Sequence, residues 1–281
     1  MRISLITPTW NQAEFLEETI RSVLAQNYPN LEWIVIDALS TDATPQILAR
    51  YAHLPWLKII READGGQSDA INKGMRLATG EVAAWLNSDD LLVPGALHQI
   101  VEAFIAYPEA TAIYGLGAKI NREGELIRVV PYRSFDRKRL ATALEAVQPA
   151  TYFRRDAFWG VGGLRTDLCY AMDWDLLIRL ADRGKIIAIN VVIAKIRYYA
   201  DTKTATGGWT RMREIAQIGR EHNGFFDWNH ISFLMRQVTP PLRFARKIVD
   251  AFFWWVTKSR PIMVQNWPNY KSDVTQKRET L

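Results

Sequence analysis

Apolar residues along the first part of the chain recur with the period of strands and then of helices, in alternation. Continuous apolar runs predict buried strands at residues 3–7, 33–37, 57–60, 82–86 and 112–114. Between these strands, apolar residues at helical spacing predict helices over residues 13–25, 45–51, 68–77 and 95–106. Because strands alternate with helices, we predict an α/β protein with a doubly wound, mostly parallel sheet and helices on both faces.

The pattern becomes less regular after residue 114. A turn signal at residues 121–124 predicts a hairpin, which is followed by two helices and an apolar strand at residues 186–193. We therefore predict one domain over residues 1–205, made of two halves at 1–114 and 115–205. Residues 206–281 are predicted to form a helical, basic C-terminal extension that frays at residues 271–281.

The C-terminal extension contains an amphipathic segment at residues 243–260. Its apolar positions, among them Phe244, Ile248 and Trp255, follow helical spacing, and Arg and Lys residues flank them. The run is too short and too charged to span a bilayer, which needs about 20 apolar residues. It predicts a helix that either lies on a membrane surface or packs against the first domain.

The composition is that of a folded protein, because 48% of the 281 residues are apolar and 23% are charged. The net charge of +5 comes from residues 209–281, where twelve Lys or Arg residues stand against six Asp or Glu residues. Such a basic tail suits phosphate, nucleic acid or an anionic membrane surface, and charge alone does not select among them.

The cysteine content and the N-terminal residues indicate in which cellular compartment the protein is expected. Cys169 is the only cysteine, which excludes an intrachain disulfide and a cysteine zinc cluster. The chain enters a predicted strand within its first residues, and the apolar stretch there is too short for a secretory signal. We therefore expect a cytoplasmic protein, which the amphipathic segment would bring to the inner face of a membrane if it binds lipid.

Carboxylates follow several of the predicted strands. Asp37, Asp64, Asp89 and Asp90 stand at such positions, and parallel strands place their carboxyl ends at one edge of a sheet. Paired carboxylates suit Mg²⁺ or Mn²⁺, which prefer oxygen ligands and commonly bind substrate phosphates as well. A divalent cation would also relieve the repulsion between these acids and a phosphate. The alternative is that Asp89 and Asp90 turn the chain and cap the next helix.

Two common nucleotide-binding motifs are missing from the sequence. No G-x-G-x-x-G follows the first predicted strand, and no G-x-x-x-x-G-K-[ST] occurs in the chain. These absences argue against dinucleotide-dependent oxidoreductases and against P-loop enzymes.

Five segments in order resemble motifs of the family-2 glycosyltransferases, which have the GT-A fold and use nucleotide-diphosphate sugars. They lie at residues 4–11, 35–42, 65–74, 86–90 and, as a pair, 148–151 with 171–175, so the resemblance covers about residues 2–205. It implies that residues 1–114 bind the nucleotide and that residues 115–205 bind the acceptor. Five ordered matches are more specific than any single short motif.

The resemblance also implies roles for individual residues. Asp37 would accept a hydrogen bond from the donor base, and Asp173 would be the catalytic base. Asp89 and Asp90 would hold the Mn²⁺ or Mg²⁺ ion in the place of the family's D-x-D motif. The remaining donor-binding positions that it implies are Thr7, Pro8, Thr9, Asn11, Asp64, Gln67, Asp69, Asn72, Asn87, Ser88 and Arg197.

Several positions depart from the family pattern. Ala38 and Leu39 stand where a second Asp and a Gly are common, and Asn87 replaces the first Asp of the D-x-D motif. Met172 occupies a position that is often Glu, and Tyr199 occupies one that is often His. These departures bear on metal affinity and donor choice, and they leave the catalytic base in place.

Some of these residues have a plainer alternative role. Asp173 stands at the start of a predicted helix, where it would either deprotonate the acceptor hydroxyl in an inverting transfer or act as an N-cap. Arg179 would either pair with Asp175, four residues before it on that helix, or lie in the site, and we expect the ion pair. Asp37 would otherwise stabilise a turn, and Arg197 would otherwise be a solvated cation at a strand end.

We predict a metal-dependent, inverting glycosyltransferase that acts on a saccharide or lipid-linked acceptor in polysaccharide or cell-envelope biosynthesis, with a UDP-sugar as the family's usual donor. A sugar-1-phosphate nucleotidyltransferase is a second class, but it would need a Gly-rich basic loop where Pro8 and Asn11 stand. A module that uses its basic tail to bind membranes or nucleic acid would leave the acids at the sheet edge unexplained. We expect no nucleic-acid partner.

Overall fold

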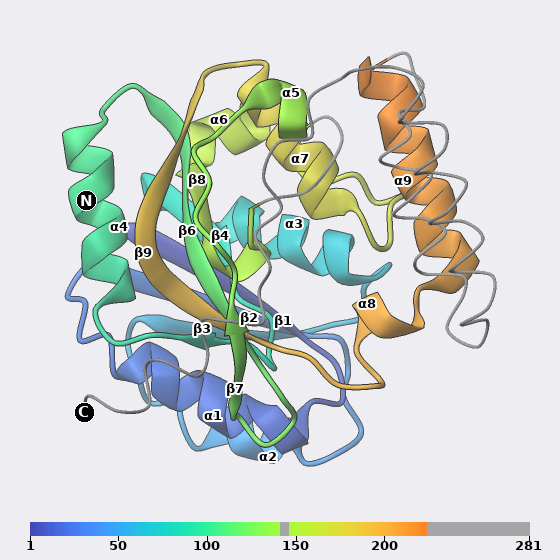
Figure 1. Cartoon of the computed structure of the whole chain (residues 1–281). Coiled ribbons are helices and arrows are strands. Elements are labelled where there is room, and N and C mark those ends of the chain that lie inside the picture. The colour runs from blue at the N-terminus through green and yellow to red at the C-terminus, as the bar shows by residue number, and fades with distance from the viewer. Residues whose placement is uncertain (141–145, 224–281) are drawn as a thin grey trace, which may run out of the picture. The chain divides into compact units, whose positions relative to one another are not determined.

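The computed structural model describes residues 1–140 and 146–223. Within these residues one sheet contains nine strands in the order β3-β2-β1-β4-β8-β6-β9-β5, and β7 pairs with β6 outside this order (Figure 1). The strands are β1 (Ile3–Thr9), β2 (Leu31–Asp37), β3 (Leu57–Arg61), β4 (Val82–Trp85), β5 (Leu91–Leu92), β6 (Ala110–Ile120), β7 (Leu126–Val129), β8 (Thr151–Arg154) and β9 (Lys185–Arg197).

Helices cover both faces of the sheet, which confirms the predicted α/β class. Side chains of α1, α2 and α4 belong to one buried apolar cluster, and side chains of α3, α6, α7 and α9 belong to a second one. The helices are α1 (Ala13–Leu24), α2 (Thr44–Ala49), α3 (Gln67–Leu77), α4 (Ala96–Ala106), α5 (Arg137–Leu140), the 3-10 turn η1 (Gln148–Ala150), α6 (Arg155–Gly160), α7 (Met172–Ala181), α8 (Lys203–Thr206) and α9 (Gly208–Asn223).

The first four strands in the sheet order are parallel. β2 lies between β1 and β3, and β4 flanks β1 on the other side. Every residue of β1 and β2 is buried, which explains why each strand reads as an almost continuous apolar run. The register pairs Thr9 with Asp37, so both strands end at the same edge.

The second half of the sheet is mixed. β8 lies antiparallel between β4 and β6, and β9 runs parallel to β6. The predicted hairpin forms between β6 and β7, with Gly124 at a φ of 87° in its turn. The strand predicted at residues 186–193 is longer in the structure, because β9 extends to Arg197 and pairs with β5 near that end.

Helix α9 continues the fold beyond residue 205. Ile215 and Ile218 are buried in the same cluster as Leu176 and Leu177 of α7. In Figure 1, α9 is drawn in orange beside α7 in yellow-green. A helix of the predicted extension therefore packs with the helix that carries Asp173.

Other predictions concern the C-terminal residues. The amphipathic segment at residues 243–260 and the frayed end at residues 271–281 lie outside the described residues, and the domain boundary at residue 205 stays a prediction. Among the residues that the structure describes, no helix is both long enough and apolar enough to cross a membrane.

Candidate active site

The loops that follow β1 and β2 are joined through Asn11. This residue has a φ of 51°, a left-handed conformation that Asn tolerates better than most residues. Its backbone N–H donates to Ser40 Oγ at 2.8 Å, and its side-chain Oδ1 accepts the Thr41 N–H at 2.8 Å. These bonds fix the two loops against each other at the carboxyl edge of the sheet.

Asp37 and Thr9 place two unsatisfied oxygens at this edge. Asp37 is fully buried, and its Oδ1 accepts the Ser40 N–H at 3.0 Å, so the turn predicted for it is present. Asp37 Oδ2 lies 3.2 Å from Arg61 Nε as an ion pair, but it accepts no hydrogen bond, and Thr9 Oγ1 has none either. A buried polar atom without a hydrogen bond costs about 1–3 kcal/mol. The charge of Arg61 offsets part of this cost at Asp37.

Two acids shape the loop that leads into α3. Asp64 Oδ1 accepts the Gly66 N–H at 2.8 Å, and Asp69 Oδ2 accepts the Gly65 N–H at 2.9 Å. The Gly65 N–H and the ammonium of Lys73, at 3.3 Å, lower the pKa of Asp69. Gly66 has a φ of 113°, which disfavours any residue with a side chain.

The amide of Asn87 is the centre of a hydrogen-bond network. Its Oδ1 accepts from Gln67 Nε2 at 2.7 Å, and its Nδ2 donates to Asp90 Oδ2 and to Gln148 Oε1, both at 3.1 Å. Gln67 in turn accepts from Lys203 Nζ at 2.8 Å. An Asp at position 87 would lack the two donors that this network uses.

Asp89 and Asp90 carry negative charge that their surroundings compensate only in part. Asp90 is 2% exposed, its Oδ1 accepts the Arg197 N–H at 3.1 Å, and burial together with the charge of Asp89 raises its pKa well above the ordinary value. Asp89 is half-buried, and burial raises its pKa too. Asp89 Oδ2 accepts from the Tyr199 hydroxyl at 3.3 Å, and burial and Asp89 raise the pKa of Tyr199 to about 12.

The helix-capping alternative for this segment is wrong. Helix α4 begins at Ala96 after Gly95, no side chain caps it, and β5 separates it from Asp90. Ser88 is buried, and its carbonyl oxygen accepts from Thr19 Oγ1 at 2.9 Å. The two acids therefore stand on a loop that is held by buried contacts.

Some residues from the implied donor site are engaged elsewhere. Thr7 is fully buried, and its Oγ1 accepts from Trp33 Nε1 at 2.9 Å. Asn72 bonds both backbone groups of Leu164, donating at 2.8 Å and accepting at 3.0 Å. These two side chains stabilise the fold around the site.

Arg197 is not the solvated cation of the alternative interpretation. It is 2% exposed, because the end of β9 packs against α1, and its guanidinium lies 4.6 Å from the centre of the Phe15 ring. Its Nη2 donates to Glu18 Oε2 at 2.7 Å, and its Nε donates to the Asp89 carbonyl oxygen at 3.1 Å. Arg197 thus holds the backbone of the acidic pair, and its contact with a donor stays a prediction.

Asp173 is the second residue of α7. The N-cap is Ala171, so the capping role considered for Asp173 is wrong. The carboxylate is half-buried, and its Oδ1 accepts the Trp174 N–H at 2.8 Å. Burial raises its pKa, although the nearby cations Arg211 and Lys203 act in the opposite direction.

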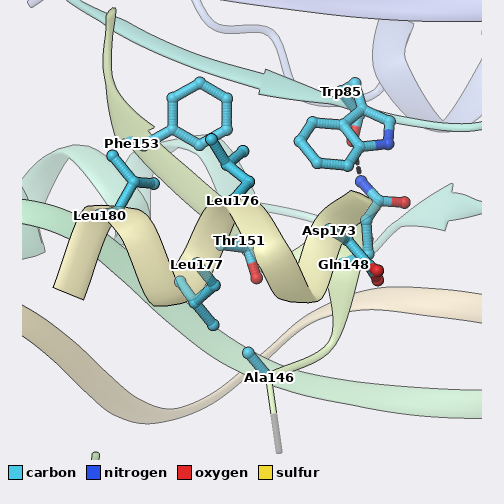
Figure 2. Close-up of a pocket in the computed structure, with 9 residues that line it drawn as sticks. All are labelled: Trp85, Ala146, Gln148, Thr151, Phe153, Asp173, Leu176, Leu177 and Leu180. Carbon is cyan, nitrogen blue, oxygen red and sulfur yellow. Dashed lines mark hydrogen bonds between the residues drawn. The ribbon is translucent and has the colours of Figure 1, made fainter. Parts of the chain in front are cut away.

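A small pocket lies beside Asp173 (Figure 2). Gln148 reaches it from η1 and donates from Nε2 to the Trp85 carbonyl oxygen at 2.7 Å. Because Gln148 also bonds Asn87, hydrogen bonds connect Asp90 to a residue that lines the same pocket as Asp173. The pocket is lined by Trp85, Ala146, Gln148, Thr151, Phe153, Asp173, Leu176, Leu177 and Leu180.

Glu214 of α9 holds the loop before Asp173, and sequence analysis missed it. Its buried carboxylate accepts the backbone N–H groups of Cys169 at 2.8 Å, Tyr170 at 2.6 Å and Ala171 at 3.1 Å. These amides precede the first turn of α7, where helix N–H groups lack partners within the helix. The only sign of this role in the sequence was the position of an acid next to the apolar residues of α9.

Asp175 belongs to a buried cluster of ion pairs that joins α7 to α9. It is fully buried and pairs with Arg179 at 2.6 Å, which confirms the predicted ion pair. His222 Nε2 lies 3.0 Å from its Oδ1, and Arg165 lies 3.6 Å away and also pairs with Glu221. Asp175, Glu221 and His222 are close enough to share one cation. Arg165 already supplies positive charge to both carboxylates, so this cluster fits an anchor between α7 and α9 better than a metal site.

Replacing Asn87 with Asp should destabilise the protein at neutral pH. The variant loses the donors to Asp90 and Gln148 and sets a third carboxylate beside the acidic pair. We expect a loss of about 1–3 kcal/mol in unfolding free energy, measured by urea unfolding with a chelator present. The loss should shrink as the pH falls through the raised pKa of Asp90, because that carboxyl becomes neutral.

Asn190→Asp, at an exposed position of β9, is the control with the same change in charge. Equal stabilities of the Asn87 variant and this control at pH 7 would contradict the importance of the network.

Comparison with known proteins places these features in a family. Residues 4–162 match the family described as Glycosyl transferase family 2. A chondroitin synthase of Pasteurella multocida (strain Pm70) is 27% identical over 192 residues, which are 68% of this chain and 20% of that protein. The chain therefore spans about a fifth of the length of this relative.

Solved structures agree in fold. S. aureus TarS in complex with UDP-GlcNAc aligns with a TM-score of 0.62 at 19% identity, over 88% of this chain and 74% of that one. The mannosyltransferase PcManGT from Pyrobaculum calidifontis, in complex with GDP-Man and Mn²⁺, gives a TM-score of 0.57 at 24% identity, over 86% and 67%. Since the family match covers more than half of the chain and the GT-A fold agrees with it, this chain belongs to the family-2 glycosyltransferases.

Proposed function

We propose that the chain transfers a sugar from a nucleotide-diphosphate sugar to a saccharide or lipid-linked acceptor, with inversion in a single displacement. The observation that carries the proposal is the path Asp90–Asn87–Gln148, which leads from the acidic pair to the pocket beside Asp173. The donor and the acceptor must meet at one site, and this path connects the acidic pair with the pocket that Asp173 lines.

The donor base would bind at the ends of β1 and β2. Thr9 Oγ1 and Asp37 Oδ2 are neighbouring buried oxygens without hydrogen bonds, and a nucleobase offers the polar groups that would satisfy them. Complexes of TarS with UDP-GlcNAc and of PcManGT with GDP-Man support a nucleotide-sugar donor. We propose a UDP-sugar for this chain.

The acidic pair fits a hard divalent cation, Mn²⁺ or Mg²⁺. Burial raises the pKa of both carboxyls, the charge of Asp89 raises that of Asp90 further, and a cation would relieve this cost. Asp90 already accepts from Asn87 and from the Arg197 N–H, so Asp89 is the better ligand. When bound, such an ion would stabilise the negative charge of the departing diphosphate. PcManGT in complex with Mn²⁺ supports this proposal.

Asp173 would take the proton of the acceptor hydroxyl. Its raised pKa makes it a stronger base than an exposed Asp, and such a shift is typical of catalytic carboxylates. The apolar wall of the pocket would keep water from competing with the acceptor. We further propose that the acceptor belongs to polysaccharide or cell-envelope biosynthesis, on the cytoplasmic side, with segment 243–260 as a membrane contact.

Calorimetric titration tests the donor site. We expect one of UDP, GDP and dTDP to bind wild-type protein more tightly with Mn²⁺ than with a chelator. The Asp89→Ala variant should lose the Mn²⁺-dependent part. Mn²⁺ affinity should rise with pH through the raised pKa values of Asp89 and Asp90, because a proton competes with the metal for each carboxylate.

Asp201→Ala is the matched control, since its carboxylate is 80% exposed and lies on the loop after β9. It should bind the nucleotide as wild type does. If no nucleotide binds under any condition, or if Asp89→Ala binds as tightly as wild type, the proposal is wrong.

A further inference from the structure

Two cations face each other across the hairpin of β6 and β7. The antiparallel register pairs Lys119 directly with Arg128, so their side chains stand on the same face. Like charges at such positions destabilise a sheet. Burial lowers the pKa of Lys119, and repulsion from Arg128 and Arg211 lowers it further. The repulsion between these two cations therefore destabilises the hairpin.

An aromatic ring completes the cation pair. The Lys119 ammonium lies 5.3 Å from the centre of the Tyr198 ring, within the range of a cation–π contact. Tyr198 is 48% exposed, although its ring is large and apolar. An open aromatic face beside two cations can pack against a sugar ring while the cations bind an acid that the sugar carries.

The cation cluster reaches the catalytic segment. Arg211 acts electrostatically on Lys119, on Tyr198 and on Asp173, so these groups surround one region. Lys203 approaches the same region, with its ammonium 5.8 Å from the centre of the Tyr170 ring, three residues before Asp173. Arg211 is thus within electrostatic range of both the Lys119–Arg128 pair and the proposed base.

Negative charge near the cluster comes from Asp173 and Glu214, which act electrostatically on Lys203. Within residues 1–140 and 146–223, neither Lys119, Arg128 nor Lys203 has a carboxylate at ion-pair distance. Lys203 instead donates to Gln67, which belongs to the donor-side network of Asn87. Lys119 and Arg128 take no part in that network, whereas Arg211 acts electrostatically on both Lys119 and Asp173.

We propose that Lys119, Arg128 and Tyr198 form an acceptor subsite for a sugar or polyol that bears an acidic group, a carboxylate or a phosphate, close to the hydroxyl that Asp173 deprotonates. This subsite deepens the proposed function and rests on it. The reacting unit would lie beside Asp173, and the cluster would hold the acidic neighbour.

The test compares acidic probes with neutral ones on protein saturated with UDP and Mn²⁺. The probes are methyl glucuronide against methyl glucoside, and glycerol 1-phosphate against glycerol, with dissociation constants measured by NMR titration. We expect at least one acidic probe to bind about 10-fold or more tightly than its neutral counterpart, the scale of one charge-assisted contact. The pair that shows the preference distinguishes a carboxylate from a phosphate.

The double variant Lys119→Gln/Arg128→Gln should lose this preference while its affinity for UDP stays unchanged. The control is Lys185→Gln/Lys195→Gln, which removes two charges from β9. Lys195 pairs with Ala118, so it lies one position away from Lys119 and on the opposite face of the sheet. The control should keep the preference for the acidic probe. Thermal unfolding of both variants checks that they fold.

Three results would overturn the proposal: equal binding of acidic and neutral probes by wild type, an unchanged preference in the double variant, or a loss of UDP affinity there. The last result would assign the cluster to the donor diphosphate. Failure of UDP, GDP and dTDP to bind any form of the protein would instead refute the proposed function, and the acceptor assignment with it.

Discussion

Replacing Asp173 with Asn is expected to reduce sugar transfer by about 100-fold or more, the scale of general-base catalysis, while nucleotide binding stays unchanged. The amide keeps the shape of the side chain and cannot take a proton from the acceptor. The wild-type rate should fall as the pH decreases through the raised pKa of Asp173, because the protonated carboxyl is inactive as a base. Release of the nucleotide from the donor, followed against pH, measures both effects.

The same substitution should leave the fold intact or stabilise it. Burial raises the pKa of Asp173, so folding favours its neutral form, and the ionised form costs stability as the pH rises through that pKa. An uncharged Asn avoids this cost at neutral pH. We expect a melting temperature equal to or above that of wild type.

Asp182→Asn is the control for the activity measurement, since this residue follows α7 and its carboxylate is 52% exposed. It should keep wild-type turnover. Full turnover by Asp173→Asn would rule out Asp173 as the base, and a folding defect in that variant would contradict the stability argument.

Replacing Asp175 with Asn is expected to have the opposite outcome, a loss of about 3 kcal/mol or more in unfolding free energy. The carboxylate is fully buried and balances Arg179 and Arg165, which would lose a counter-charge in the variant. For a protein of this size, such a loss lowers the melting temperature by about 6–12 °C. Urea unfolding monitored by tryptophan fluorescence measures the change directly.

Asp167→Asn provides the comparison, because Asp167 also pairs with Arg165, but its carboxylate is 60% exposed. Exposed ion pairs contribute about 0–1 kcal/mol, so this variant should remain close to wild type. If Asp175→Asn kept its stability and lost turnover, Asp175 would replace Asp173 as the candidate base.

Much of the fold was predictable because its signals are local. Three of the first four parallel strands, β1, β2 and β4, are buried along their whole length, so each appears as a largely apolar run between helices with an apolar stripe. The ion pair of Asp175 and Arg179 was equally predictable, since positions four apart meet on any helix. Local spacing was sufficient for these features.

The sequence did not reveal which polar side chains point into the site. Thr7 and Asn72 lie in matching motifs, yet distant groups, Trp33 and Leu164, take their hydrogen bonds. Such pairings depend on tertiary packing, over sequence separations that no periodicity records. The role of Glu214 was not predicted for the same reason. Its three hydrogen bonds join residues that are more than 40 positions apart.

Glu214 also limits where the chain can be cut without loss of support for the loop before Asp173. The family match ends at residue 162, whereas the loop before Asp173 is held by a carboxylate of α9. A gene fusion or an expression fragment cut after β9 would carry every matched motif and still lack this support. Recombination during evolution, like engineering in the laboratory, would have to carry α9 together with the sheet to transplant a working enzyme.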